Sequence, residues 1–510
     1  MFKSANIIKY ALMLAGKLAL ILFLSSFDHA ADLQGGLYNP DLRYHGTLMS
    51  DTSRTANQVA QGINCVSLTV SWNAFEPQEG VISETYALEI EKKLNSFKRS
   101  GANVVLDFGM HYPPGWVTQV PNSRYVNQYG DAYILAESGR NVVNGVFNKT
   151  IRKKMAAYIG RVFNRFGAEN FFAVRVGGGY WAELHYPDNQ FNSKSNCYWG
   201  YDAIAKNEVP NMLPEGISPN PVPDWKPGQT STNNESARQF INWYIGALSN
   251  YQNFQIATIR KHFSGLLNIL YADWSVRPGQ MEDAIATNLN GSSFAEFYGQ
   301  LQKGHAPQQH IEALPEDANL VAYTTSFNSV HPWSHDINFV NEGSSNPKDW
   351  SPVHFLSWLA NNHYPKLKVW GENSGNNPYS QMQLIFQRIK DYGAMGVMWA
   401  FESSLYSSNP SYANLSDFVS LIALNAPSGT TNIYDMPEIN VFPNPAKDKI
   451  NIRSETELTG KRFGIYDTMG REITSGYFAA GTNEIHLDNM TKGLYFLQID
   501  YLQTMKFVKY

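Results

Sequence analysis

The sequence contains little cysteine, and its charges nearly cancel. Two cysteines, Cys65 and Cys197, permit at most one disulfide and form no Cys-x-x-Cys or His/Cys cluster of the kind that holds structural zinc. Forty basic and forty-four acidic residues give a net charge of −4, and no basic stripe follows the chain. We therefore expect no nucleic acid partner, because such a partner needs a concentrated positive surface.

Long apolar runs are also missing, apart from a short one near the amino terminus. There, Lys3 and Lys9 precede an apolar stretch that ends at Leu24 and is followed by small residues. This pattern predicts a secretory signal peptide over residues 1–31 rather than a spanning helix, because Lys17 interrupts the stretch. An uncleaved membrane anchor is the alternative. No other segment approaches ~18 apolar residues, so we expect no transmembrane segment in the mature protein.

Aromatic residues, in contrast, are abundant. They make up 14% of the 510 residues, while charged residues make up 16%, below the usual ~25%. Such a chain can bury a large core, which excludes general disorder. Its length fits two or three domains of about 150 residues, although a single barrel can absorb most of it.

Strand-like segments alternate with helical ones through the central part of the chain. Amphipathic helices are predicted at 85–100, 150–166 and 236–263. Eight strand–helix units favour an α/β fold, a (β/α)₈ barrel over residues 32–425. The predicted strands are 44–49, 65–72, 103–108, 172–177, 266–272, 319–324, 366–371 and 396–401. Long loops over 113–149 and 187–235 follow the third and fourth strands, on the face where barrels build their active sites.

The carboxyl-terminal part has a different character. After a predicted linker at 426–437, residues 438–510 consist of short alternating segments separated by turns, which predicts a small all-β sandwich. Pro-Asn-Pro at 443–445, the Asp-x-x-Gly-Arg turn at 467–471 and the strand from Gly493 to Ile499 occur in order. This segment resembles the C-terminal sorting domain of type IX secretion cargo. The resemblance implies the type IX secretion machinery as a partner and delivery to the cell surface or the medium. A generic β-sandwich is the alternative.

Two glutamates stand at predicted strand ends. Glu183 follows the fourth strand and Glu372 ends the seventh, each beside glycines and aromatic residues. Carboxyl-terminal strand ends meet on one face of a barrel, so these two side chains can converge. Glycoside hydrolysis needs two such carboxyl groups, one to protonate the leaving oxygen and one to attack the sugar or activate water. It needs no metal and no cofactor, and we expect neither.

The same motifs resemble known glycosidase families. Residues 72–80 look like the second-strand signature of barrel β-galactosidases of glycoside hydrolase family 42. Residues 182–187, Ala-Glu-Leu-His-Tyr-Pro, are similar to the Gly-Glu-Leu-Arg-Tyr-Pro stretch that holds the acid of the β-amylases, family 14. Gly371-Glu372-Asn373, followed by Tyr379 and a helix at 380–392, is similar to the stretch that holds their base.

The resemblance implies roles for both glutamates. Glu183 is then the general acid, with a pKa raised by a partly apolar setting near Trp181, and Glu372 is the base or nucleophile. A separation of about 5–5.5 Å would mean retention and about 6.5–9.5 Å inversion, and the β-amylase likeness favours inversion. The mobile loop of β-amylases is not recognisable after the third strand, so the substrate is not carried over.

Further residues at strand ends are candidates for substrate binding. His111, Asn373 and an Asp273–Arg277 pair can hydrogen-bond sugar hydroxyls, while Trp181 and Trp399 offer rings for stacking. His111 and Trp399 can equally be structural, and Asp273 with Arg277 can simply brace the rim. Glu76 and Glu402 are further strand-end carboxylates that we expect to be structural, with Glu402 the substitute if Glu372 is not the base.

Two functions remain open at this point. The first is a secreted glycoside hydrolase that acts on an extracellular oligo- or polysaccharide. The second is a catalytically silent carbohydrate-binding barrel at the cell surface, which keeps the aromatic residues but does not need both glutamates. The discriminating feature is whether Glu183 and Glu372 face one another across a cleft.

Overall fold

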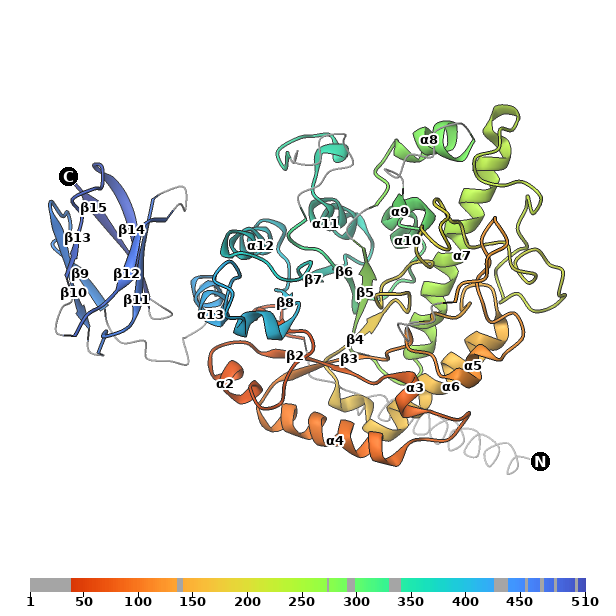
Figure 1. Ribbon diagram of the computed structural model, residues 1–510, viewed down its shortest axis with the longest axis horizontal. Helices are drawn as coiled ribbons and strands as arrows, with labels where there is room; N and C mark the ends of the chain where they lie inside the picture. The colour runs from red at the N-terminus through yellow and green to blue at the C-terminus, as the bar shows by residue number, and fades with distance from the viewer. Residues whose placement is uncertain are drawn as a thin grey trace, which may run out of the picture.

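The structure of the protein is a computed structural model (Figure 1). It describes residues 38–134, 141–272, 275–290, 299–329, 341–425, 439–454, 457–467, 472–480, 484–499 and 503–510. The predicted signal peptide at 1–31 and the predicted linker at 426–437 lie outside these ranges. Within them, no helix is both long enough and apolar enough to cross a membrane.

Eight parallel strands form the central sheet, as predicted from the sequence. Their order is β7-β6-β5-β4-β3-β2-β1-β8, and a bridge between Glu372 and Met398 links its two edges into a nearly closed barrel. The strands are β1 (Gly46–Thr47), β2 (Cys65–Thr69), β3 (Asn103–Asp107), β4 (Ala173–Val176), β5 (Leu266–Tyr271), β6 (Leu320–Thr324), β7 (Lys368–Gly371) and β8 (Met398–Trp399).

Side chains alternate between the two faces of the barrel wall, because successive residues of a strand point in opposite directions. One buried cluster fills the interior and includes Val105, Tyr323 and Trp370. The other lies between the strands and the outer helices and includes Val174 and Trp399. Beyond this interior cluster, at the carboxyl ends of the strands, inward-facing residues can form a site.

Helices surround the sheet in Figure 1, with α4, α6, α7, α11 and α12 on its outside. Asn148 caps α6, because its side chain accepts hydrogen bonds from the first backbone amides of that helix. The α-helices are α2 (Thr55–Ala60), α3 (Trp72–Phe75), α4 (Glu84–Arg99), α5 (Gly115–Thr118), α6 (Lys149–Phe166), α7 (Glu235–Ile259), α8 (Gln280–Ala284), α9 (Gly299–Gln302), α10 (Pro307–Glu312), α11 (Pro352–Asn362), α12 (Tyr379–Tyr392) and α13 (Leu415–Leu424).

The carboxyl-terminal part forms two antiparallel sheets with their own buried core, as the sequence predicts. One sheet has the order β13-β10-β9 and the other β12-β11-β14-β15. Their strands are β9 (Ile439–Phe442), β10 (Lys449–Ser454), β11 (Arg462–Tyr466), β12 (Glu472–Tyr477), β13 (Glu484–His486), β14 (Gly493–Ile499) and β15 (Gln503–Lys509).

The two cysteines do not pair. Cys65 lies in the barrel interior on β2, while Cys197 lies in the loop after β4, and both are buried free thiols. A buried thiol of this kind packs as a small apolar residue.

Candidate active site

A cavity of about 600 Å³ opens at the carboxyl ends of the barrel strands. Both predicted catalytic glutamates line it, together with three of the predicted binding residues, His111, Trp181 and Asn373. The other lining residues are Leu48, Met49, Ser67, Thr69, Ser71, Asp107, Tyr112, Arg175, Tyr180, Ala182, Thr325, Ser374, Gly375, Ala400 and Phe401.

Three glycines after β4 shape the loop that carries Glu183. A Cβ atom on Gly177 would lie 2.1 Å from the carbonyl oxygen of Ala182, and one on Gly179 would lie 2.6 Å from that of Glu183. The backbone amide of Gly179 instead donates a 2.7 Å hydrogen bond to the Glu183 carbonyl. Ala182 adopts a φ of 67°, which completes the tight turn. Glycine is needed here because two backbone segments meet without space for a side chain.

The His185 ring lies beside the Glu183 carboxylate, with its Nε2 atom 3.3 Å from Oε2. We expected a raised pKa for Glu183, and this expectation is wrong. Burial raises the pKa, but the neighbouring His185 ring, with contributions from Thr325 and Lys303, brings it below the ordinary value.

Glu372 is held at the end of β7 by its backbone and by two donors. Its amide bonds to the carbonyl of Thr324, which continues the ladder with β6. Its Oε2 atom accepts hydrogen bonds of 2.7 Å from both Arg175 and Tyr323. Burial raises the pKa of Glu372 above its ordinary value, although Arg175 and Tyr323 oppose the rise.

The two glutamates interact electrostatically. The negative charge of Glu183 is one of the causes that raise the pKa of Glu372. The positive charge of Arg175 opposes this effect on Glu372, and the Nε atom of Arg175 also lies 3.5 Å from Asp107. Glu183, in the loop after β4, and Glu372, after β7, therefore line one cavity together with the buried Arg175.

Asn373 and the aromatic residues form the rest of the rim. The Asn373 side chain donates to and accepts from the backbone of Ala400, which ties β7 to the end of β8. Trp181 and Phe401 are 55% and 44% exposed beside the cavity. Exposed rings beside a cavity suit the apolar face of a sugar.

Two predicted binding residues, Trp399 and Arg277, are not among the residues that line the cavity. Trp399 points outward from β8 and packs against Phe418 of α13, so it belongs to the core. Arg277 is buried, where it donates to Ser275 and lies over the ring of Phe355. Asp273 lies outside the described residues.

The other strand-end carboxylates are also engaged elsewhere. Glu76 accepts hydrogen bonds from Trp72 and Arg161, and Glu402 accepts from Arg54 and Gln58. Neither is among the residues that line the cavity. Both positions fit the structural role expected for them.

The site also involves five residues for which no role was expected, namely Asp107, Arg175, His185, Tyr323 and Phe401. Arg175 carried a signal, because a charged residue inside an otherwise apolar strand of four residues calls for a buried partner. Tyr323 is an aromatic residue in a buried strand and gave no comparable signal, since such residues usually belong to the core.

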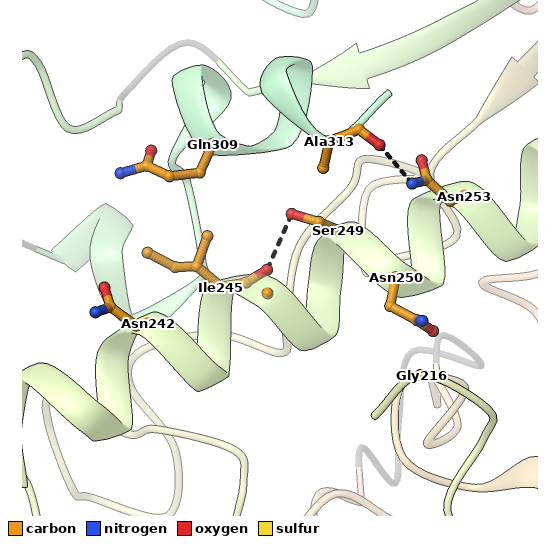
Figure 2. Close-up of a pocket in the computed structure, with 9 residues that line it drawn as sticks. Gly216, Asn242, Ile245, Ser249, Asn250, Asn253, Gln309 and Ala313 are labelled. Atoms are coloured by element: carbon orange, nitrogen blue, oxygen red, sulfur yellow. Dashed lines mark hydrogen bonds between the residues drawn. The ribbon is translucent and has the colours of Figure 1, made fainter. Parts of the chain in front are cut away.

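A second hollow of about 380 Å³ lies between α7 and α10 (Figure 2). Four of its nine lining residues have amide side chains, and one of them, Asn253, donates to the carbonyl oxygen of Ala313. Ser249 donates to the carbonyl oxygen of Ile245 (Figure 2). No carboxylate lines this hollow, so the paired-carboxylate chemistry belongs to the barrel cavity. In the part of the chain that the structure describes, no group of three or more His, Cys, Asp or Glu side chains forms a metal site.

The carboxyl-terminal sheets have a recognisable counterpart. Residues 440–509 match the family of secretion system C-terminal sorting domains. This match confirms the resemblance drawn from the tail motifs and indicates export by type IX secretion. No curated protein sequence matches the chain.

The barrel is similar to solved glycoside hydrolases. The catalytic domain of the β-amylase from Paenibacillus polymyxa is 16% identical, with a TM-score of 0.53 and coverage of 76% of this chain and 100% of that one. The β-galactosidase from Marinomonas ef1 is 13% identical, with a TM-score of 0.49 and coverage of 75% and 59%. The first likeness shows the fold, a (β/α)₈ barrel.

Proposed function

We propose that the protein is an exported glycoside hydrolase that cleaves O-glycosidic bonds of an extracellular oligo- or polysaccharide. The observation that carries the proposal is that Glu183 and Glu372 line the same cavity at the carboxyl ends of the strands. Within the proposal, residues 1–31 are the signal peptide and the sorting domain directs the enzyme to the cell surface or the medium.

The role of each carboxyl group is assigned from the likeness of its motif to those of the β-amylases. Glu183 protonates the leaving oxygen as the glycosidic C–O bond breaks, so the electron pair of that bond stays with the oxygen. Glu372 attacks the anomeric carbon or removes a proton from the attacking water. Arg175 and Tyr323 both bond to Oε2 of Glu372, which stabilises the carboxylate while the other oxygen serves the reaction.

The remaining cavity residues bind and orient the sugar. Trp181 and Phe401 offer exposed rings, and His111 and Asn373 border the same space. The likeness of the glutamate motifs to those of β-amylases favours inversion, with Glu372 as a base.

The test is sugar release from a panel of α-glucans, β-galactosides and β-glucans, followed by proton NMR. We expect Glu183→Gln and Glu372→Gln each to lower the rate by roughly 10²–10⁴-fold. Glu402→Gln is the matched control, because Glu402 is a strand-end carboxylate outside the cavity lining, and it should keep its activity. The first anomer released distinguishes inversion from retention.

Equal rates for all four proteins would contradict the two-glutamate mechanism. Binding of a glycan without release by the unaltered protein would instead favour a silent carbohydrate-binding barrel, the alternative function. That alternative gives Trp181 and Phe401 a role in binding. It gives no role to the hydrogen bonds that Arg175 and Tyr323 donate to Glu372.

A further inference from the structure

His185 lies directly behind Glu183 and out of reach of solvent. Its side chain is 2% exposed, against 17% for that of Glu183. Its Nδ1 atom lies 2.5 Å from the carbonyl oxygen of Tyr186. A carbonyl oxygen can only accept a hydrogen bond, so Nδ1 carries a hydrogen. The other ring nitrogen, Nε2, faces the Glu183 carboxyl group.

The hydrogen on Nδ1 restricts what can lie between His185 and Glu183. If the ring were neutral and Glu183 ionised, a lone pair on Nε2 would face a carboxylate oxygen 3.3 Å away, and two acceptors would be buried together without a donor. A single proton removes this conflict, whether it resides on Nε2 or on Oε2. The contact is therefore satisfied only while the pair holds at least one proton.

The surroundings keep the ring in place. A Cβ atom on Gly179 would lie 3.1 Å from Nδ1, so the ring occupies space that only a glycine leaves open. His305 packs edge-on against His185, with ring centroids 5.6 Å apart. Lys303 acts on Glu183 through its charge, and its ammonium group lies 3.2 Å from Asp188. Among the described residues, Glu183 is the carboxylate paired with His185.

We propose that Glu183 and His185 act as one acid that shares a single proton, with His185 as the positioning residue that holds the proton for Glu183. This inference deepens the proposed function and rests on it. The proton passes from Nε2 to the Glu183 carboxylate and then to the leaving oxygen, which keeps the electron pair of the broken C–O bond. After this transfer, neither Nε2 of His185 nor the Glu183 carboxylate carries a proton, so two acceptors face each other. This unfavourable contact favours reprotonation of the pair by water.

This property belongs to the chain itself. The β-amylase stretch to which residues 182–187 are similar has an arginine at the position of His185. A guanidinium can bind a carboxylate, but the guanidinium itself does not release a proton at accessible pH. An imidazole can do both, because its ordinary pKa of about 6.5 lies in the working range.

The first experiment needs no substrate. The full chain is labelled with ¹³C in its histidine rings, and the His185 signal, identified by its loss in His185→Asn, is followed by NMR from pH 4 to pH 9. We expect a ring with hydrogen on Nδ1 in its neutral form. Glu183→Gln should lower the midpoint of its titration, because the carboxylate that stabilises the cation is gone.

Glu372→Gln is the matched control, since it removes another cavity carboxylate that has no contact with His185. Its effect on the His185 midpoint should be much smaller. The same midpoint in Glu183→Gln and in the unaltered protein would overturn the proposal, as would a neutral ring with hydrogen on Nε2. Failure of the proposed function leaves this readout intact, so the two failures are distinguishable.

The second experiment is the pH profile of sugar release. In His185→Asn, Glu183 alone must keep the proton, and burial then acts on its pKa without the opposing effect of His185. The basic limb of the profile should therefore move. His310→Asn, which removes another buried histidine outside the cavity, should leave the limb in place. A uniform loss of rate in His185→Asn without a shift of the limb would mean a purely structural role.

Discussion

The hydroxyl group of Tyr323 donates a hydrogen bond of 2.7 Å to Oε2 of Glu372, the same oxygen that Arg175 contacts. Tyr323 comes from the interior cluster of the barrel, so this bond connects the packed core to the cavity. It fixes the orientation of a carboxylate whose burial alone would disfavour its charge.

Replacement of Tyr323 by phenylalanine should therefore weaken the proposed base or nucleophile. The variant loses one donor that lowers the pKa of Glu372, so this pKa should rise and the acidic limb of the profile should move to higher pH. We expect roughly a 10- to 100-fold loss in kcat/KM and a stability cost of about 1 kcal/mol. The measurement is kcat/KM against pH.

Tyr271→Phe is the matched control for this prediction. The Tyr271 hydroxyl donates to Gln252, away from the cavity, so its removal should cost similar stability without moving the acidic limb. The same limb shift in both variants would show that a general loosening of the barrel, rather than the bond to Glu372, sets the profile.

Gly179 should not tolerate a side chain. A Cβ atom there would meet the backbone carbonyl oxygens of Glu183 and His185 at 2.6 and 2.8 Å, and neither can move without the whole turn. Gly179→Ala should lower the free energy of unfolding by about 1–3 kcal/mol and displace the acid. Urea unfolding and the rate of sugar release measure the two effects.

Gly246→Ala provides the contrast. Gly246 lies within α7, and a Cβ atom there meets nothing within 4 Å. Alanine should raise the stability by about 0.5–1 kcal/mol, because it favours the helix and limits the unfolded chain. Equal effects of the two substitutions would refute the steric argument for Gly179.

Trp181 should contribute to binding more than to the chemical step. Its ring is 55% exposed beside the cavity, in position to stack on a sugar. Trp181→Ala should raise KM by roughly 10-fold with a smaller change in kcat. Tyr364→Ala, a change at an exposed ring outside the cavity lining, should change neither constant. A fall in kcat alone would contradict a binding role.

Stability at low pH should depend on Glu342. Burial raises the pKa of this carboxyl group, but the hydrogen bond from His354 and the charge of Arg388 outweigh it and bring the pKa to about 2. A folded-state pKa below the unfolded one contributes stability above the ordinary value of 4.5, and this is lost as the pH falls towards 2.

Glu342→Gln should therefore be less stable than the unaltered protein at pH 7, and the difference should shrink at pH 3. The measurement is the free energy of unfolding in urea at both values. Glu89→Gln, at an exposed position of α4, is the control and should have little effect at either pH. A difference that stays constant between the two pH values would exclude the ion pairs as its source.

The order of strands and helices was predictable because each element carries its own local pattern. The predicted strands at 103–108 and 319–324, for example, coincide closely with β3 and β6. The tail motifs were equally readable, since their turns and alternating residues are contiguous in the chain. The same holds for Glu183 and Glu372, which stand next to glycines at strand ends.

The predictions that did not hold depended on the direction in which a side chain points. Trp399 stands at a strand end, but its side chain faces outward to α13, because the alternation of the strand places Met398 on the inner face. Arg277 is buried against Phe355 rather than turned to the cavity. Position along a strand alone does not say which face a side chain takes.

The sequence by itself thus determined a parallel barrel, a separate β tail and two carboxylates at the carboxyl ends of strands. Only the tertiary structure decided which charges meet. Arg175 and Glu372 are 197 residues apart and share a hydrogen bond because the barrel brings β4 and β7 to one cavity. The lowered pKa of Glu183 likewise follows from the placement of His185 beside it in a tight turn. Electrostatic interactions depend on distances in space and on burial, and a linear sequence specifies neither.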